Sequence, residues 1–225
     1  MNIIYLSEYK KQRKLKTMAE LTTNFQMRNQ QEIPNGNDSI VAESVIEKIK
    51  QIQSGELIIT MDELINNILE IQKSDSKINA DPFTHIVKIV EKLHFQVHQR
   101  MLPKWISGYI HINKKQNKKS IVVNSKVEFH QQRFVIAHEL AHFIYDYKGT
   151  PKYIDFYKKN NHGTLKEKRA NTFAAKLLMP KDKFEEKYLI TKKEDANLIF
   201  IVYRLAKIFK VQPKAINKRL YEVIY

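Results

Sequence analysis

Residues 133–145 read Arg133-Phe-Val-Ile-Ala-His-Glu-Leu-Ala-His-Phe-Ile-Tyr145, an apolar run that is interrupted by His138, Glu139 and His142. Apolar residues cover nearly every other face of this segment, so the pattern predicts a helix that is buried on all sides over about residues 130–145. Unpaired polar side chains in such a helix would cost several kcal/mol. The run therefore predicts the centre of the fold and a functional site within it.

The spacing of the two histidines is typical of a metal site. His138 and His142 are four residues apart, so in a helix they lie on the same face, one turn apart. Two imidazole nitrogens can then bind one tetrahedral ion at about 2.0–2.1 Å. Glu139 lies about 100° around the helix from His138, where it can contact a water molecule without binding the ion. Zinc hydrolases need this arrangement, although a pattern of five residues can also arise by chance.

Length and composition limit the class of protein. The chain has 225 residues, enough for one substantial domain and an appendage. It has no cysteine, which excludes disulfides and cysteine-bound zinc, so any metal site must use His, Asp and Glu. No apolar run approaches the roughly 20 residues that span a bilayer, and the apolar block in the first residues is too short for a secretion signal. We expect a soluble, cytoplasmic protein.

The net charge of +15 would attract nucleic acid, an anionic membrane surface or an acidic protein. The lysines are spread along the chain, with small clusters at residues 10–16, 114–119 and 158–159. This spread favours a solvated surface over a single binding patch. The charge alone therefore predicts no partner.

Residues 1–79 are predicted to form an N-terminal appendage, helical or partly disordered. Its first part is polar and basic, with a possible helix at residues 10–28. Apolar residues then recur at helical spacing over residues 40–53 and again after Thr60, which forms a capping box with Glu63. The role of this appendage cannot be read from its sequence.

Residues 80–225 are predicted to form the main domain, of the α+β class. Asp81-Pro82 predicts a helix start, with Asp81 as the N-cap and proline at the first helical position. Strand-like segments follow at 95–99, 106–112 and 120–124, which we expect to pair as a small antiparallel sheet before the buried helix.

A further helix is predicted to begin at Thr164 and to end before Met179-Pro180, after an irregular segment at 146–163. Its buried stripe consists of apolar residues at helical spacing, namely Ala170, Phe173, Ala174, Leu177 and Leu178. Glu167 falls on the same stripe, so a carboxylate points where the core should be.

Glu167 has two interpretations. Thr164 and Glu167 fit a capping box, in which the glutamate reaches back to the start of its helix. Alternatively, Glu167 completes a His-His-Glu zinc site with an open fourth position. Asp146 is one turn beyond His142 and should be out of reach of the same ion. Asp155 and His162, in the irregular segment, remain possible third ligands.

Two blocks of the sequence resemble a known family. The first is Phe134-Val-Ile-Ala-His-Glu-Leu-Ala-His-Phe143, and the second is Glu167-Lys-Arg-Ala-Asn-Thr-Phe-Ala-Ala-Lys-Leu-Leu-Met-Pro180. Together they are similar to the signature of the ImmA/IrrE family of zinc metallopeptidases, and the likeness extends over about residues 81–225. Ala141 stands where members of the family commonly have glycine, a change between small residues.

The resemblance implies a zincin-like domain that binds Zn²⁺ and hydrolyses peptide bonds. By this likeness His138, His142 and Glu167 are the metal ligands, although two histidines and one carboxylate also suit other divalent ions. Glu139 would take a proton from the attacking water and deliver it to the leaving amine. Asn171 would accept the ring N–H of a ligand histidine and fix its tautomer.

The resemblance also implies a partner. Members of the family act on helix-turn-helix repressors, often of mobile genetic elements or stress regulons, so a protein substrate of this kind is expected. An extended surface such as the edge of the sheet at residues 95–124 could bind it. Tyr145, Tyr147 and His162 are candidates to stabilise the oxyanion, and their spacing does not choose among them.

The end of the chain offers a different class of function. Residues 205–220 predict two amphipathic helices separated by Val211-Gln-Pro213, an outline like a helix-turn-helix. The chain could then be a DNA-binding regulator with a sensing or vestigial metal site. We prefer the interpretation that these helices complete the core of the peptidase.

Overall fold

A computed structural model describes residues 36–150, 152–158, 164–194 and 196–224. The chain divides into two compact units, Met1–Asn35 and Gly36–Tyr225, and all described residues belong to the second. The helix expected at residues 10–28 lies outside the described residues. None of the helices in the described ranges combines the length and the apolar character that a membrane span requires.

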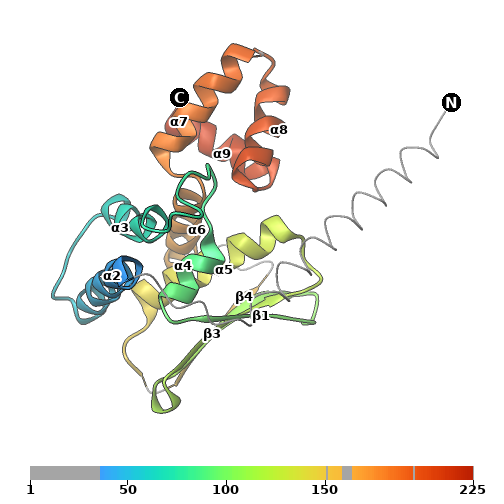
Figure 1. The fold of residues 1–225 in the computed structure, drawn as a ribbon. Helices are drawn as coiled ribbons and strands as arrows, with labels where there is room; N and C mark the ends of the chain where they lie inside the picture. The colour runs from blue at the N-terminus through green and yellow to red at the C-terminus, as the bar shows by residue number, and fades with distance from the viewer. Residues whose placement is uncertain (1–35, 151, 159–163, 195, 225) are drawn as a thin grey trace. The chain divides into compact units, whose positions relative to one another are not determined.

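The described residues form helices and strands in an α+β order, as the sequence predicts (Figure 1). The helices are α2 (Gly36–Ser54), α3 (Met61–Lys73), α4 (Ile86–Lys92), α5 (Phe129–Asp146), α6 (Leu165–Leu178), α7 (Lys181–Glu194), α8 (Leu198–Phe209) and α9 (Pro213–Val223). The strands are β1 (Gln96–Arg100), β2 (Ile106–Asn113), β3 (Lys118–Asn124) and β4 (Lys152–Lys158), with the short 3-10 helix η2 (Lys114–Gln116) between β2 and β3.

The sheet is mixed. Its strand order is β1-β3-β2-β4; β2 pairs antiparallel with β3 and β4, whereas β1 pairs parallel with β3. The sequence predicts an antiparallel sheet, and this prediction is wrong for the β1–β3 pair, which is parallel. The physical reason is that β3 turns back from β2 and lies between β2 and β1, so it runs in the direction of β1. Strand β4 is a second difference, because residues 146–163 were expected to be irregular.

Helix α5 packs directly on the sheet. Gly108 of β2 faces Val135 of α5 so closely that a Cβ atom at Gly108 would overlap Val135 Cγ1 and would lie 2.7 Å from the carbonyl oxygen of Val122. Ile110 and Ile121, on β2 and β3, are fully buried beneath the helix. A side chain at position 108 would therefore push α5, and the histidines it carries, away from the sheet.

Gly108→Ala is expected to lower the free energy of unfolding by about 2–3 kcal/mol, since overpacking forces the helix or the sheet to move. Urea denaturation measures this change. Gly55→Ala is the matched control: its added Cβ meets nothing within 4 Å, although its φ of +84° costs some strain. Equal losses for the two variants would show that the close contact of α5 with the sheet does not limit stability.

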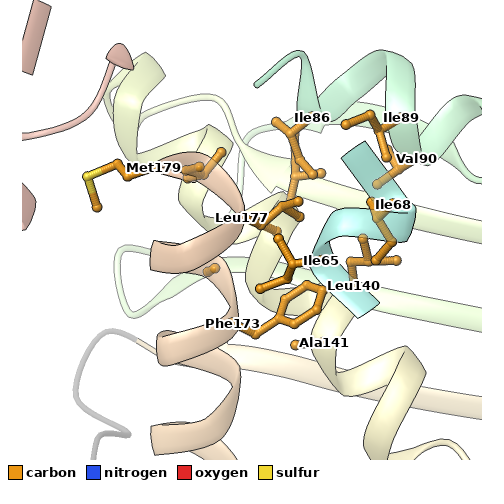
Figure 2. Packing of buried hydrophobic residues seen from close by; sticks show 14 of the residues in the cluster. Ile65, Ile68, Ile86, Ile89, Val90, Leu140, Ala141, Phe173, Leu177 and Met179 are labelled. Atoms are coloured by element: carbon orange, nitrogen blue, oxygen red, sulfur yellow. The ribbon is translucent and has the colours of Figure 1, made fainter. Parts of the chain in front are cut away.

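The other side of α5 packs against helices. Figure 2 shows Leu140 and Ala141 of α5 among side chains of α3, α4 and α6, including Phe173 and Leu177. Leu140, Phe173 and Leu177 are fully buried. Helix α5 thus lies between the sheet and a layer of helices, which explains why apolar residues surround it on nearly all sides.

Helices α2 and α3 share this core. Val45 and Ile49 of α2 and Leu64 of α3 belong to the same hydrophobic cluster as Leu140, and Gln53 Nε2 donates a hydrogen bond to the carbonyl of Phe143, at 2.7 Å. The boundary between compact units falls after residue 35, whereas the sequence predicts an appendage over residues 1–79. The reason is that the apolar faces of α2 and α3 are buried against the main body.

Helix α4 begins later than predicted. Its N-cap is His85, and the helix starts at Ile86 rather than at Pro82. The preceding residues are held by hydrogen bonds from distant parts of the chain: Arg133 Nη2 donates to the carbonyl of Thr84, at 2.6 Å, and Thr84 Oγ1 donates to that of Leu177, also at 2.6 Å. These tertiary bonds replace the bonds of a first helical turn.

Two buried arginines attach the C-terminal helices. Arg133 Nη1 donates to the carbonyl of Phe209, at the end of α8, at 2.8 Å, and Arg219 Nε of α9 donates to that of Met179, at 3.1 Å. Phe209 itself packs against Phe184 of α7. Helices α8 and α9 therefore pack on the body of the domain.

Candidate metal centre

Helix α5 presents two histidines side by side. His138 is 0% exposed and His142 is 3% exposed, and their Nε2 atoms lie 2.9 Å apart. Because the residues are one helical turn apart, their rings leave the same face of the helix. The spacing in the sequence thus translates into two converging nitrogen atoms in a buried place.

Helix α6 brings Glu167 to the same place. The hydroxyl of Thr164 accepts a hydrogen bond from the backbone N–H of Glu167, at 3.2 Å, and so caps the helix. The carboxylate of Glu167 faces the histidines: Oε2 lies 3.3 Å from His138 Nε2, and Oε1 lies 3.5 Å from His142 Nε2. The backbone of Glu167 serves the cap while its side chain joins the histidines.

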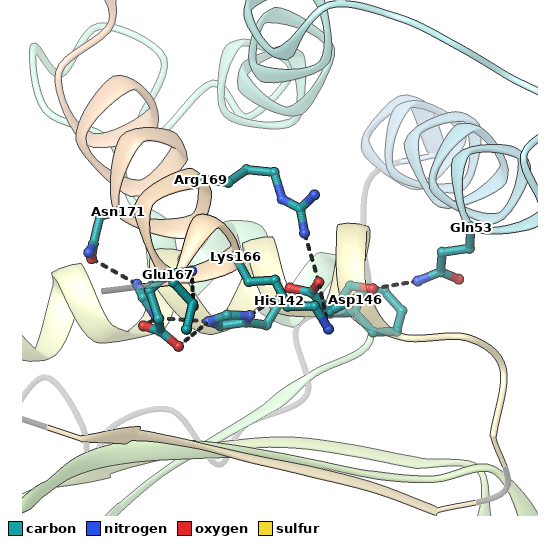
Figure 3. A network of polar contacts seen from close by, with 10 residues as sticks. Gln53, His142, Asp146, Lys166, Glu167, Arg169 and Asn171 are labelled. Carbon is teal, nitrogen blue, oxygen red and sulfur yellow. Dashed lines mark hydrogen bonds and ion pairs between the residues drawn. The ribbon is translucent and has the colours of Figure 1, made fainter. Parts of the chain in front are cut away.

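The other nitrogen of each ring is also engaged (Figure 3). His138 Nδ1 donates to Asn171 Oδ1, at 3.0 Å, and His142 Nδ1 donates to Asp146 Oδ2, at 2.8 Å. Asp146 in turn accepts a hydrogen bond from Arg169 Nη2, at 2.7 Å. Since both rings carry their proton on Nδ1, both Nε2 atoms present a lone pair toward Glu167.

This donor set fits a metal ion. One ligand atom from each of His138, His142 and Glu167 lies within 4.8 Å of the others. Ligands at about 2.0–2.1 Å from a tetrahedral ion are about 3.3 Å apart, close to the three separations in the structure. Three electron-rich atoms that converge in a buried place repel one another, and a cation relieves this repulsion. The group can therefore hold a metal ion through three side chains, and the tetrahedral geometry leaves a fourth position.

Burial sets the protonation of the site. It lowers the pKa of His138, and this outweighs the opposite influence of the Glu167 carboxylate. The neutral ring that a metal ligand requires is thus favoured. Burial by itself would raise the pKa of Asp146, but the hydrogen bond from His142 and the charge of Arg169 together lower it. Asp146 therefore remains ionised and accepts the proton-bearing side of the His142 ring.

The remaining predicted residues lie as follows. Glu139 is 0% exposed, in the same turn of α5 as His138. Tyr147 donates its hydroxyl to the carbonyl of Thr150, at 2.8 Å, and the ring of Tyr145 lies beneath the guanidinium of Arg169. Asp155 is on β4, with its backbone paired to β2; its side chain and all of His162 lie outside the described residues.

The position of Asp146 differs from what its place in the sequence predicts. Asp146 was expected to lie out of reach of an ion held by the two histidines; in the structure its carboxylate lies behind the His142 ring and contacts Nδ1. The signal was present in the sequence: residues 142 and 146 are four apart on a helix, so their side chains are neighbours. Arg169, which holds Asp146, carries no comparable signal because it comes from another helix.

Asp146→Asn is expected to weaken metal binding by about 10–100-fold, as is common when the partner of a ligand histidine is changed. The reason is that a neutral amide orients the His142 ring less strongly and loses the charge that Arg169 stabilises. Competition with a fluorescent zinc chelator measures the affinity. Asp182→Asn, the same change at an exposed residue of α7, is the control and should have no effect. Equal affinities for both variants would contradict the orienting role.

No curated protein matches the chain. Among solved structures, a Mycobacterium tuberculosis transcriptional regulator aligns with 82% of this chain, at 14% identity and a TM-score of 0.38, and the alignment covers 52% of that chain. The present chain thus spans about half the length of that regulator. Residues 90–221 match the family model of the IrrE N-terminal-like domain, Peptidase_M78. This match covers more than half of the chain and includes the His-His-Glu group, so the chain belongs to this metallopeptidase family, as its two signature blocks predicted.

Proposed function

We propose that this protein is a zinc-dependent endopeptidase whose substrate is a helix-turn-helix transcriptional repressor. The observation that carries the proposal is the convergence of His138 Nε2, His142 Nε2 and the Glu167 carboxylate in a buried place, 2.9–3.5 Å apart. In this proposal these three side chains are the zinc ligands, and Glu139 is the catalytic base.

When bound by these side chains, a zinc ion supplies Lewis-acid chemistry that raises the acidity of a water molecule and the electrophilicity of a carbonyl carbon. Glu139 accepts the proton of the attacking water, and its burial keeps bulk water from competing for that proton. The same carboxyl group then donates the proton to the leaving amine. Asn171 and Asp146 accept the Nδ1 protons of the two imidazole rings. Each ring is thereby held in the tautomer whose Nε2 lone pair faces Glu167.

The substrate part of the proposal rests on the ImmA/IrrE likeness and on two features of the chain. The net charge of +15 favours an acidic protein segment. Strand β1 is at an edge of the sheet, and an edge strand can pair with an extended peptide through its backbone. Release of a repressor from its operator would then follow from its cleavage, and the expected cytoplasmic location agrees with such a substrate.

The test is a cleavage assay. Zinc-loaded full-length protein is incubated with purified helix-turn-helix repressors from the same genome, those encoded beside its own gene first, and the products are mapped by mass spectrometry. One defined cut that disappears with a chelator and returns with added zinc supports the proposal. Intact repressors in every sample, with zinc bound, would contradict the choice of substrate; cleavage that persists after zinc is removed would contradict the metal mechanism.

The DNA-binding alternative is measured in parallel. Lys214, Lys218 and Tyr221 of α9 are exposed, and basic side chains on a helix can contact phosphates. However, the exposed face of α8 is apolar at Leu198 and Ile199, which does not suit a helix that lies across a DNA backbone. DNA retention that falls steeply with salt and persists in the Glu139→Gln variant would favour the regulator.

A further inference from the structure

A cavity of about 390 Å³ lies between α5, α6 and α9. This volume is in the range of cavities that bind ligands. Apolar side chains line one part of it, among them Phe134, Leu178, Met179 and Val211. A polar solute gains little from such walls, whereas a large apolar side chain gains from leaving water.

The cavity shares a wall with the candidate metal centre. Asn171 lines it and also accepts the hydrogen bond of His138, at 3.0 Å. Phe134, which lines the cavity from α5, has its ring centroid 6.2 Å from that of the His138 ring. Whatever fills the cavity is therefore one side chain away from a proposed zinc ligand. This proximity suits a part of the substrate better than an unrelated ligand.

The opening of the cavity is basic. Lys214 and Lys218 are exposed and one turn apart on α9. Among the described lining residues, Glu222 is the single carboxylate, and it lies 3.7 Å from Lys218 Nζ and 3.4 Å from the guanidinium of Arg219. Three cations and one anion leave a net positive charge, so a carboxylate is attracted to this opening.

We infer that this cavity binds a segment of the protein substrate in which a large apolar side chain is flanked by carboxylates. The apolar side chain enters between α5, α6 and α9, and the carboxylates contact Lys214 and Lys218. The inference rests on the proposed function and deepens it, since it gives the chemistry of the substrate segment. DNA also carries negative charge, but a phosphate backbone offers no apolar group to fill the cavity.

Three fluorescein-labelled peptides provide the test: Gly-Ser-Glu-Leu-Glu-Ser-Gly, a counterpart with lysine for glutamate, and a counterpart with alanine for leucine. Their binding to the zinc-loaded full-length chain is measured by fluorescence anisotropy, in the Glu139→Gln background so that turnover does not interfere. The first peptide is expected to bind at least about tenfold more tightly than either counterpart. Equal binding of the acidic peptide with alanine would show that only charge is recognised, and would overturn the inference.

Reversing the charge of lysines at the opening tests whether the acidic peptide binds at the cavity. Lys214→Glu combined with Lys218→Glu is expected to weaken the first peptide by about tenfold, whereas Lys207→Glu, an exposed lysine of α8 that does not line the cavity, should change it less than twofold. Ala175→Phe, which fills the cavity from α6, should also abolish binding. Equal effects of the Lys207 and cavity variants, or no binding of any peptide, would overturn the inference.

Failures of the two proposals can be told apart. Tight binding of the acidic peptide with no cleavage of any repressor keeps the cavity inference and rejects the proposed substrate. Cleavage of a repressor at an unchanged kcat/KM in the cavity variants keeps the peptidase and rejects the inference. A labelled DNA duplex is measured beside the peptides; loss of duplex binding alone in the lysine variants would overturn the inference in favour of nucleic acid.

Discussion

Replacing Glu167 with alanine is expected to reduce the zinc content of the purified protein from about one ion per chain to nearly none. The change removes the carboxylate that lies 3.3 and 3.5 Å from the two Nε2 atoms, so two imidazoles alone must hold the ion. We expect the affinity to fall by more than about 100-fold. Mass spectrometry of the metal content, followed by competition with a chelator, measures both quantities.

Two further variants separate the ligand role of Glu167 from its position in a helix cap. Thr164→Ala removes the hydroxyl that accepts the N–H of Glu167; it should cost about 1 kcal/mol of stability and leave zinc bound. Glu167→Gln keeps a side chain that can serve a capping box but loses the charge, and it should lose zinc. If Glu167→Ala and Glu167→Gln both retain the ion, Glu167 is only a cap, and Asp155 and His162 become the candidate ligands.

Much of the candidate site could be predicted because it depends on helical periodicity. The four-residue spacing of His138 and His142 and the position of Glu167 on the apolar stripe of α6 are local properties of two helices. Which helices would face each other is a tertiary property, and here the likeness to a family supplied what periodicity could not. The sequence predicts that Asn171 accepts the ring N–H of a ligand histidine, and the structure places Asn171 Oδ1 3.0 Å from His138 Nδ1. The corresponding contact of Asp146 with His142 was not predicted.

The parts of the fold that the sequence did not predict depend on distant partners. The direction of β1 relative to β3 leaves no trace in the alternation of side chains, because parallel and antiparallel strands share the same period. The late start of α4 follows from hydrogen bonds made by Arg133 and Thr84 across the domain. Strand β4, in contrast, does carry β-branched and aromatic residues, which the turn signals on both sides of it obscured.

The assignment of α2 and α3 to an appendage has a similar cause. Their amphipathic patterns show that each has a face to bury, but not against what. In the structure, Ile49 and Leu64 are buried in the same cluster as Leu140 of α5. A variant that begins at residue 80 would lack α2 and α3 and would therefore expose the core around α5. The family match, which begins at residue 90, does not include these two helices.

Glu139→Gln is expected to lower kcat by about 1,000-fold or more while the zinc content stays at the wild-type level. Glutamine has nearly the shape of glutamate but cannot accept the proton of the attacking water or return it to the leaving amine, and loss of a positioned acid–base group typically costs about 10²–10⁴-fold. Single-turnover cleavage of the proposed repressor substrate, followed by mass spectrometry, measures the chemical step. Glu128→Gln, an exposed residue just before the same helix, is the matched control and should retain full activity.

The free energy of unfolding provides a second measurement on the Glu139→Gln variant. Glu139 is 0% exposed, and burial of a carboxylate costs free energy that an amide of the same shape largely avoids. The Glu139→Gln protein should therefore unfold at an equal or higher urea concentration than the wild type, although it is inactive. A catalytic residue that destabilises its own fold is the pattern expected at an active site. Loss of activity together with loss of zinc or of stability would instead mean that Glu139 has a structural role, and the base would have to be sought elsewhere.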